Sequence, residues 1–79
     1  MKKNNEQTYK FKCTPIRCKY DTEDFKIYLV KVNPDSDIEV NPDGFTTILG
    51  NLHKLILQVE YEVTATIKRD KYGISYRVI

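Results

Sequence analysis

Hydrophobic and polar residues alternate with a period of two along most of the chain after residue 7. Such alternation is typical of β-strands that bury one face. The first alternating stretch changes phase by one residue at Pro15, and proline is tolerated at the β-bulges that absorb such a change. We therefore expect one long, bent strand over residues 8–20. Its buried face is expected to carry Tyr9, Phe11 and Cys13, then Ile16, Cys18 and Tyr20.

A second strand is predicted over residues 25–32, after a polar turn at residues 21–24. Its alternation changes phase between Leu29 and Val30, and we place a second bulge there. The inward residues are then Phe25, Ile27, Leu29, Val30 and Val32. The exposed face is expected to carry Lys26, Tyr28 and Lys31 together.

Three further strands are predicted over residues 45–49, 57–68 and 72–78. Asn-Pro-Asp turns precede the first of them, and residues 38–40 between those turns are a candidate extension of a hairpin. Residues 51–56 leave room for one short helical turn. The inward residues of the last two strands are expected to be Leu57, Val59, Tyr61, Val63, Ala65 and Ile67, followed by Tyr72, Ile74, Tyr76 and Val78.

Five strands and no substantial helix in 79 residues indicate one all-β domain over residues 8–79, preceded by a disordered polar tail at residues 1–7. A small sheet with one apolar face hides it by closing, which also removes its edges. The counts and the bent first strand predict a five-stranded OB-type barrel with little or no helix. An SH3-like barrel is the alternative.

Composition adds limits on function. The formal net charge of +2 is too small to indicate a polyanion partner by itself. Cys13 and Cys18 are expected to be reduced and to pack as small hydrophobic residues, because a zinc site would need more ligands than His53 supplies. We predict no cofactor, no membrane association and a cytoplasmic location, since neither a signal peptide nor an apolar span is visible.

Three segments together resemble the N-terminal OB domain of RecD/TraA-type ATP-dependent DNA helicases, which are exodeoxyribonuclease V alpha-subunit-like. They are IRCKY with EDFKI (residues 16–20 and 23–27), TILGNL (47–52) and KYGISYRV (71–78), and the resemblance covers roughly residues 15–79. The chain departs from the family at Asp24 and Gln58, where the family usually has Gly.

The resemblance implies that the chain is a fragment of a larger protein whose motor domains hydrolyse ATP. A phosphate-binding loop ends in Gly-Lys-Ser/Thr, and none of Gly44, Gly50 and Gly73 stands in that setting. Neither the two serines nor His53 forms a catalytic motif. We therefore expect no catalysis from these residues, and the strand that ends at Ile79 is expected to continue into further domains.

Binding of single-stranded DNA is the function that the resemblance implies. OB barrels bind oligonucleotides on the face of their second and third strands and on two flanking loops, with aromatic stacking and cationic side chains. The candidate site residues are Lys26, Tyr28, Lys31, Lys68, Arg69, Lys71, Tyr72 and Arg77. Two alternatives stay open: the second-strand row is a solvated face, and Tyr72 is a core residue.

The acidic turn at residues 21–24 opposes phosphate binding. It favours a second hypothesis, a protein-interaction module on an OB or SH3-like barrel. Such a module would dock on the helicase motor domains or recruit another protein.

Overall fold

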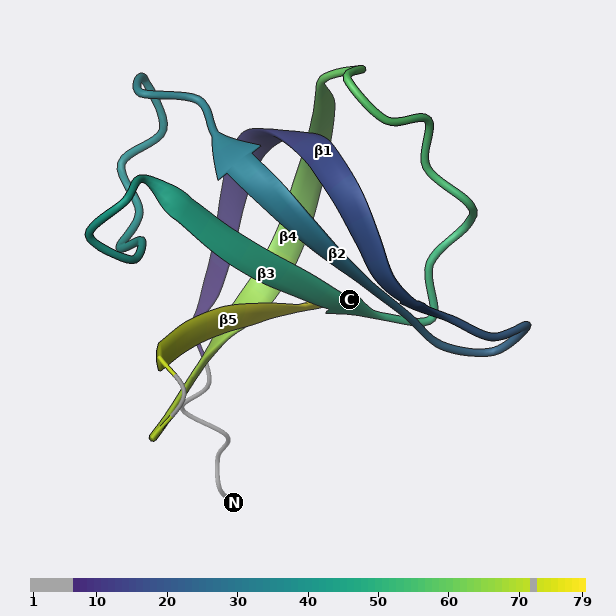
Figure 1. Ribbon diagram of the computed structural model, residues 1–79. Helices are drawn as coiled ribbons and strands as arrows, with labels where there is room; N and C mark the ends of the chain where they lie inside the picture. Colours follow the sequence, from purple (N-terminus) through teal and green to yellow (C-terminus); the bar gives the residue numbers. More distant parts are fainter. Residues whose placement is uncertain (1–6, 72) are drawn as a thin grey trace.

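The computed structural model describes residues 7–71 and 73–79, and for Asp70 the backbone alone. Within this part of the chain it contains no helix. The five strands are β1 (Thr8–Asp21), β2 (Lys26–Val32), β3 (Phe45–Gly50), β4 (Tyr61–Asp70) and β5 (Gly73–Val78). They close into a barrel in the order β1-β2-β3-β5-β4, with β3 and β5 parallel and the other neighbours antiparallel (Figure 1). The predicted five-stranded OB-type barrel is confirmed.

Two expectations fall at the edges of the described residues. The tail predicted as disordered, residues 1–7, lies outside them except for Gln7, which is exposed. Tyr72 lies outside them altogether. In the described ranges no helix is long and apolar enough to cross a bilayer.

Strand β1 is long and bent because it belongs to both halves of the barrel. Its first half, Thr8 to Cys13, pairs with β4, and its second half, Cys13 to Asp21, pairs with β2. The pairing with β2 shifts twice, once between Pro15 and Arg17 and once between Cys18 and Tyr20. The predicted bulge beside Pro15 is confirmed, and the extra residues let the strand turn the barrel's corner.

The barrel interior is filled by alternate residues of all five strands. Its buried hydrophobic residues are Phe11, Cys13, Tyr28, Val30, Val32, Ile48, Ala65 and Tyr76. Burying an aliphatic side chain such as Ile48 contributes about 1.5–3 kcal/mol. Tyr76 packs against Phe11 with ring centroids 5.0 Å apart. Its hydroxyl donates a 2.6 Å hydrogen bond to the carbonyl oxygen of Glu39, which satisfies the one polar atom that it brings into the core.

The phase predicted for β2 is wrong. The register between β2 and β3 runs without a break from Lys26, which pairs with Gly50, to Lys31, which pairs with Phe45. The bulge expected at Leu29 is therefore absent from β2, and both extra residues lie on β1. A single alternation then places Lys26, Tyr28, Val30 and Val32 inside the barrel, where Tyr28 is only 1% exposed.

Two long connections close the ends of the barrel. Residues 33–44 join β2 to β3 and pack Ile38 and Val40 against the core as a loop, so the predicted hairpin extension is wrong. Residues 51–60 leave the other end of β3 and pack Leu52 and Leu55 against the core. These residues form neither the predicted helical turn nor the start of a strand.

The fourth strand begins at Tyr61 rather than Leu57. Leu57 and Val59, expected inside, are 44% and 42% exposed. The alternation that led to this expectation spans a turn, in which the N–H of Val59 donates to the carbonyl oxygen of Ile56 at 3.3 Å. The alternation of hydrophobic and polar residues therefore continues through a turn that precedes β4, although the turn residues are not part of the strand.

Candidate nucleic-acid interface

A hollow of about 430 Å³ lies on the outer surface of the barrel, over β2, β3 and β5. Its volume is within the range of small-molecule sites. It is lined by Lys19, Tyr20, Ile27, Asn41, Thr47, Leu49, Lys68, Gly73, Ile74 and Ser75. Because these residues come from every strand of the barrel and from one loop, the barrel as a whole shapes the hollow.

The strand register explains which side chains meet here. Directly paired residues of neighbouring strands point to the same face of a sheet. Ile27 pairs with Leu49, and both point outward to form an apolar floor. The floor continues across the parallel pair Thr47–Ser75, whose side chains add two hydroxyl groups. From Ser75 the row reaches Lys68 on β4.

The second bulge of β1 supplies the aromatic side of the hollow. The extra residue at Lys19 lets Tyr20 pair with the outward-facing Ile27, whereas Cys18 pairs with the buried Tyr28. Tyr20 is consequently 53% exposed, whereas the sequence pattern predicted that it would be buried. A bulge can re-aim a side chain in this way.

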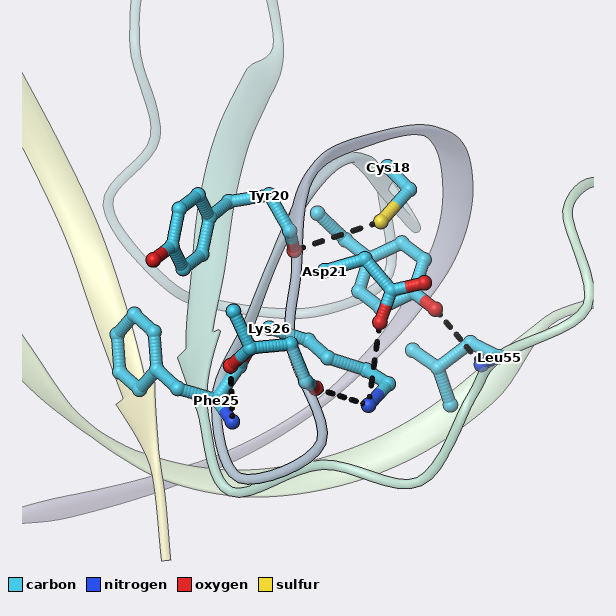
Figure 2. Close-up of polar contacts among 8 residues, drawn as sticks. Cys18, Tyr20, Asp21, Phe25, Lys26 and Leu55 are labelled. Carbon is cyan, nitrogen blue, oxygen red and sulfur yellow. Dashed lines mark hydrogen bonds and ion pairs between the residues drawn. The ribbon is translucent and has the colours of Figure 1, made fainter.

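Tyr20 is supported by Phe25, the first residue after the hairpin turn. Their ring centroids lie 6.1 Å apart with an interplanar angle of 64°. Figure 2 shows both rings on one side of the hairpin and the Lys26–Asp21 ion pair on the other. The turn is fixed by Thr22, whose hydroxyl accepts a bond from the N–H of Phe25 at 3.0 Å and donates to its carbonyl oxygen at 2.8 Å. The exposed Tyr20 ring therefore has a fixed neighbour.

The far rim of the hollow is held by Asn41. Its side-chain oxygen accepts a 3.3 Å hydrogen bond from the N–H of Ile74. The hydroxyl of Thr46 donates to the carbonyl oxygen of the same residue at 2.8 Å. Gly73 has a φ of +113°, and a Cβ there would lie 2.9 Å from the Asn41 oxygen, so this approach of the loop to β5 requires glycine.

The charged residues that line the hollow are both lysines. Strands β2, β3 and β5 contain no Asp or Glu. Lys19 and Lys68 line the hollow from β1 and β4, and both are exposed. Arg77 is also exposed and sits opposite Leu49. The site thus combines an apolar floor, one exposed aromatic ring and ammonium groups, which are the components of a surface for single-stranded nucleic acid.

Two predicted site residues are in the wrong place. Lys26 and Tyr28 are buried, at 7% and 1% exposure, because β2 carries no bulge. The Lys26 ammonium donates to the carbonyl oxygen of Thr22 at 2.7 Å, and the Tyr28 hydroxyl accepts a 2.9 Å bond from the N–H of Leu55 (Figure 2). Neither side chain faces a ligand on the outer surface.

Of the other predicted site residues, one lines the hollow and the rest lie elsewhere or outside the described residues. Lys68 lies in the hollow, while Lys31 and Arg77 are exposed beyond its lining. Arg69 instead forms a 2.6 Å ion pair with Glu39 of the 33–44 loop. The hydrogen bond to Glu39 and the charge of its carboxylate raise the pKa of the Arg69 guanidinium. Lys71 is exposed in the turn after β4, and Tyr72 is outside the described residues.

The sequence reasoning missed Lys19 and Tyr20 and treated Ile27 as a core residue. One signal was available: Tyr28, Val30 and Val32 form an unbroken alternation, which leaves Ile27 on the outer face. Accepting this phase requires a lysine inside the barrel, and its partners cannot be identified from the sequence.

Other chemistry is sparse in the described ranges. No group of three or more His, Cys, Asp or Glu side chains there is arranged to hold a metal ion. Both cysteines are free thiols. Burial, followed by the charge of Glu60, raises the pKa of Cys13 from 9.0 to about 11, so this thiol is protonated at neutral pH.

The chain was compared with protein-family models, with curated proteins and with solved structures, and none of the three comparisons found a match.

Proposed function

We propose that this domain binds single-stranded DNA in the outer hollow over β2, β3 and β5, as an accessory OB domain of a RecD-like helicase. The observation that carries the proposal is the union of Tyr20, an apolar floor and the two lysines Lys19 and Lys68 in one hollow. In this proposal the domain guides the strand, while the ATP-driven motor and its chemistry belong to other domains.

Each component has a task in such binding. A base stacked on Tyr20 contributes about 1–3 kcal/mol whatever its identity. Lys19 and Lys68 neutralise backbone phosphates and release counterions. The Thr47 and Ser75 hydroxyls lie between these groups, within reach of polar base edges. The small net charge of +2 makes the expected binding weak and sensitive to salt.

The backbone at Gln58 supports the helicase resemblance. Gln58 has a φ of +71°, which is the left-handed conformation that glycine adopts most readily. The helicase OB domains usually have Gly at this position. A shared backbone conformation would account for the family's preference for Gly at the position of Gln58.

The test is a titration of a labelled oligothymidine of about 15 nucleotides, the upper range of one OB site, followed by fluorescence anisotropy. We expect binding at low salt, weakened about tenfold by Tyr20→Ala and little by Tyr20→Phe, which keeps a stacking ring. Lys68→Glu should weaken binding and lower the slope of log K against log salt by at least about 0.7.

The matched control is Lys12→Glu, which makes the same charge change at an exposed β1 residue that does not line the hollow. Equal weakening by Lys12→Glu and Lys68→Glu would refute a defined site. An oligonucleotide that leaves the anisotropy unchanged at high micromolar protein would refute the proposed function.

A further inference from the structure

A second surface lies on residues 51–60 between β3 and β4, none of which line the hollow. Ile56, Leu57 and Val59 are 65%, 44% and 42% exposed, so three large apolar side chains face solvent within four residues. Clustered apolar exposure marks an interaction site more often than scattered single residues do. We name Ile56, Leu57 and Val59 the apolar strip.

The apolar strip is held in place by the barrel. The N–H of Ile56 donates to the Tyr61 hydroxyl at 2.9 Å, next to the bond that Leu55 donates to the Tyr28 hydroxyl. The N–H of Gln58 donates to the carbonyl oxygen of Pro15, also at 2.9 Å. Gln58 itself is held at a φ of +71°. These hydrogen bonds tie the backbone that carries the apolar strip to the barrel.

The charges beside the apolar strip indicate what covers it. Lys54 precedes the strip and Glu60 follows it, and both are exposed. The Oε2 atom of Glu60 accepts a 2.8 Å hydrogen bond from the neutral side-chain amide of Asn33, so the carboxylate keeps its negative charge. A segment with a cation at one end and an anion at the other is complementary to a second copy of itself in antiparallel orientation. A two-fold axis through the strip would set Lys54 of each protomer against Glu60 of the other and cover the apolar residues of both.

We infer that the apolar strip is a self-association surface, through which two copies of this chain form a weak, antiparallel, two-fold dimer. Three apolar side chains are far fewer than the roughly 20–30 residues a side of a standard interface, so the dimer is expected to form only at high protein concentration. This inference does not depend on nucleic-acid binding, because the proposed binding site is the hollow with Lys19 and Lys68, and the apolar strip does not line it.

Sedimentation equilibrium of the full chain over a concentration series is the test. The wild-type chain should show a monomer–dimer equilibrium. Leu57→Asp should abolish it, whereas Ile79→Asp, the same kind of change at a 76% exposed residue outside the strip, should leave it unchanged. A wild-type chain that stays monomeric at about 1 mM, where a millimolar dissociation constant is detectable, would overturn the inference.

Charge reversal tests the antiparallel geometry. Lys54→Glu alone and Glu60→Lys alone should each lower self-association about tenfold, because each sets like charges together. A mixture of the two variants should associate again, since both contacts then join opposite charges. Near-ultraviolet circular dichroism confirms that each variant is folded. If the folded mixture fails to associate, the proposed pairing is wrong, and a dimer that survives Leu57→Asp would place the interface elsewhere.

Discussion

The ammonium nitrogen of Lys26 lies 3.2 Å from the Oδ1 atom of Asp21, its partner in the last β1–β2 pair before the hairpin turn. The Lys26 side chain is 9% exposed and the Asp21 side chain 49% exposed. About half of the Asp21 side chain therefore stays in contact with water, while the buried Lys26 ammonium relies on Asp21 and on the Thr22 carbonyl oxygen as its partners. Because Lys26 is paired inside the barrel, β2 alternates between inward and outward residues along its whole length without a bulge. Ile27 then points outward and lines the floor of the hollow.

Removing Asp21 alone should destabilise the barrel more than replacing Lys26 alone or both residues together, because only the first change leaves a buried charge without its counterion. Asp21→Ala leaves a buried ammonium with a single acceptor, and we expect a loss of about 1–3 kcal/mol in the free energy of unfolding. Lys26→Met should change it by less than about 1 kcal/mol, because a well-packed apolar residue can replace a buried ion. In the Lys26→Met background, Asp21→Ala should have little effect. Urea unfolding of the four proteins forms the cycle, and additive losses would show that the pair is not coupled.

Gln58→Gly should stabilise the chain. A side chain with a Cβ costs about 1–2 kcal/mol of stability in the left-handed region, and glycine removes this cost. Part of the gain is offset because glycine has more conformational entropy in the unfolded chain. We expect a net increase of about 0.5–1 kcal/mol, seen as a rise of a few degrees in the melting temperature. Gln58→Ala, which keeps the Cβ, is the control and should bring no increase. Equal melting temperatures for the glycine and alanine variants would contradict the left-handed backbone at this residue.

The stability of the barrel should fall at alkaline pH through Cys13. Its pKa is raised to about 11 in the folded chain, whereas the thiol of the unfolded chain ionises near the ordinary value of 9.0. The unfolded state therefore loses its proton first. The contribution of the neutral Cys13 thiol to the free energy of unfolding is complete below about pH 9 and is lost as the pH rises toward 11.

The measurement is the urea midpoint as a function of pH. Cys13→Ala removes the ionising group, so its stability should decline less steeply between pH 9 and 11 than that of the wild type. Because Cys13 is fully buried and Cys18 is only half-buried, iodoacetamide should modify Cys18 first in the folded chain. Parallel pH curves for wild type and variant would rule out Cys13 as the source.

Arg69 and Lys68 are neighbours in sequence with different expected roles. The Arg69 ion pair with Glu39 is more than half exposed on both sides, so Arg69→Ala should leave the free energy of unfolding nearly unchanged. It should also leave oligonucleotide binding nearly unchanged, whereas Lys68→Ala should weaken it, because only Lys68 lines the hollow. Binding that falls equally in both variants would favour the original sequence-based assignment of both residues to one basic loop.

Much of the fold could be predicted from the sequence because it depends on local alternation. The strands, the bent β1 and its bulge at Pro15 follow from residues that are close together in the chain. The phase of β2 does not, since the choice between one bulge and none depends on whether Lys26 finds Asp21 and Thr22 across the hairpin. An isolated charge is rarely buried, and this rule favours the wrong phase when a partner exists.

The candidate site was only partly predictable for the same reason. Lys68 was identified because it lies in a basic segment next to a turn. Tyr20 was missed because one extra residue at Lys19 reverses the direction of its side chain. Leu57 and Val59 were misplaced because a turn with a positive φ at Gln58 keeps the period-two pattern while leaving the sheet.

The most direct test of the proposed site is chemical-shift mapping of the isotope-labelled chain, titrated with a short oligothymidine at low salt and low protein concentration. The account predicts that the largest amide shifts occur at Lys19, Tyr20, Ile27, Leu49, Lys68 and Ser75, which share the hollow. Shifts confined to the apolar strip or to the loop of residues 33–44, with the amides of the hollow unchanged, would contradict it.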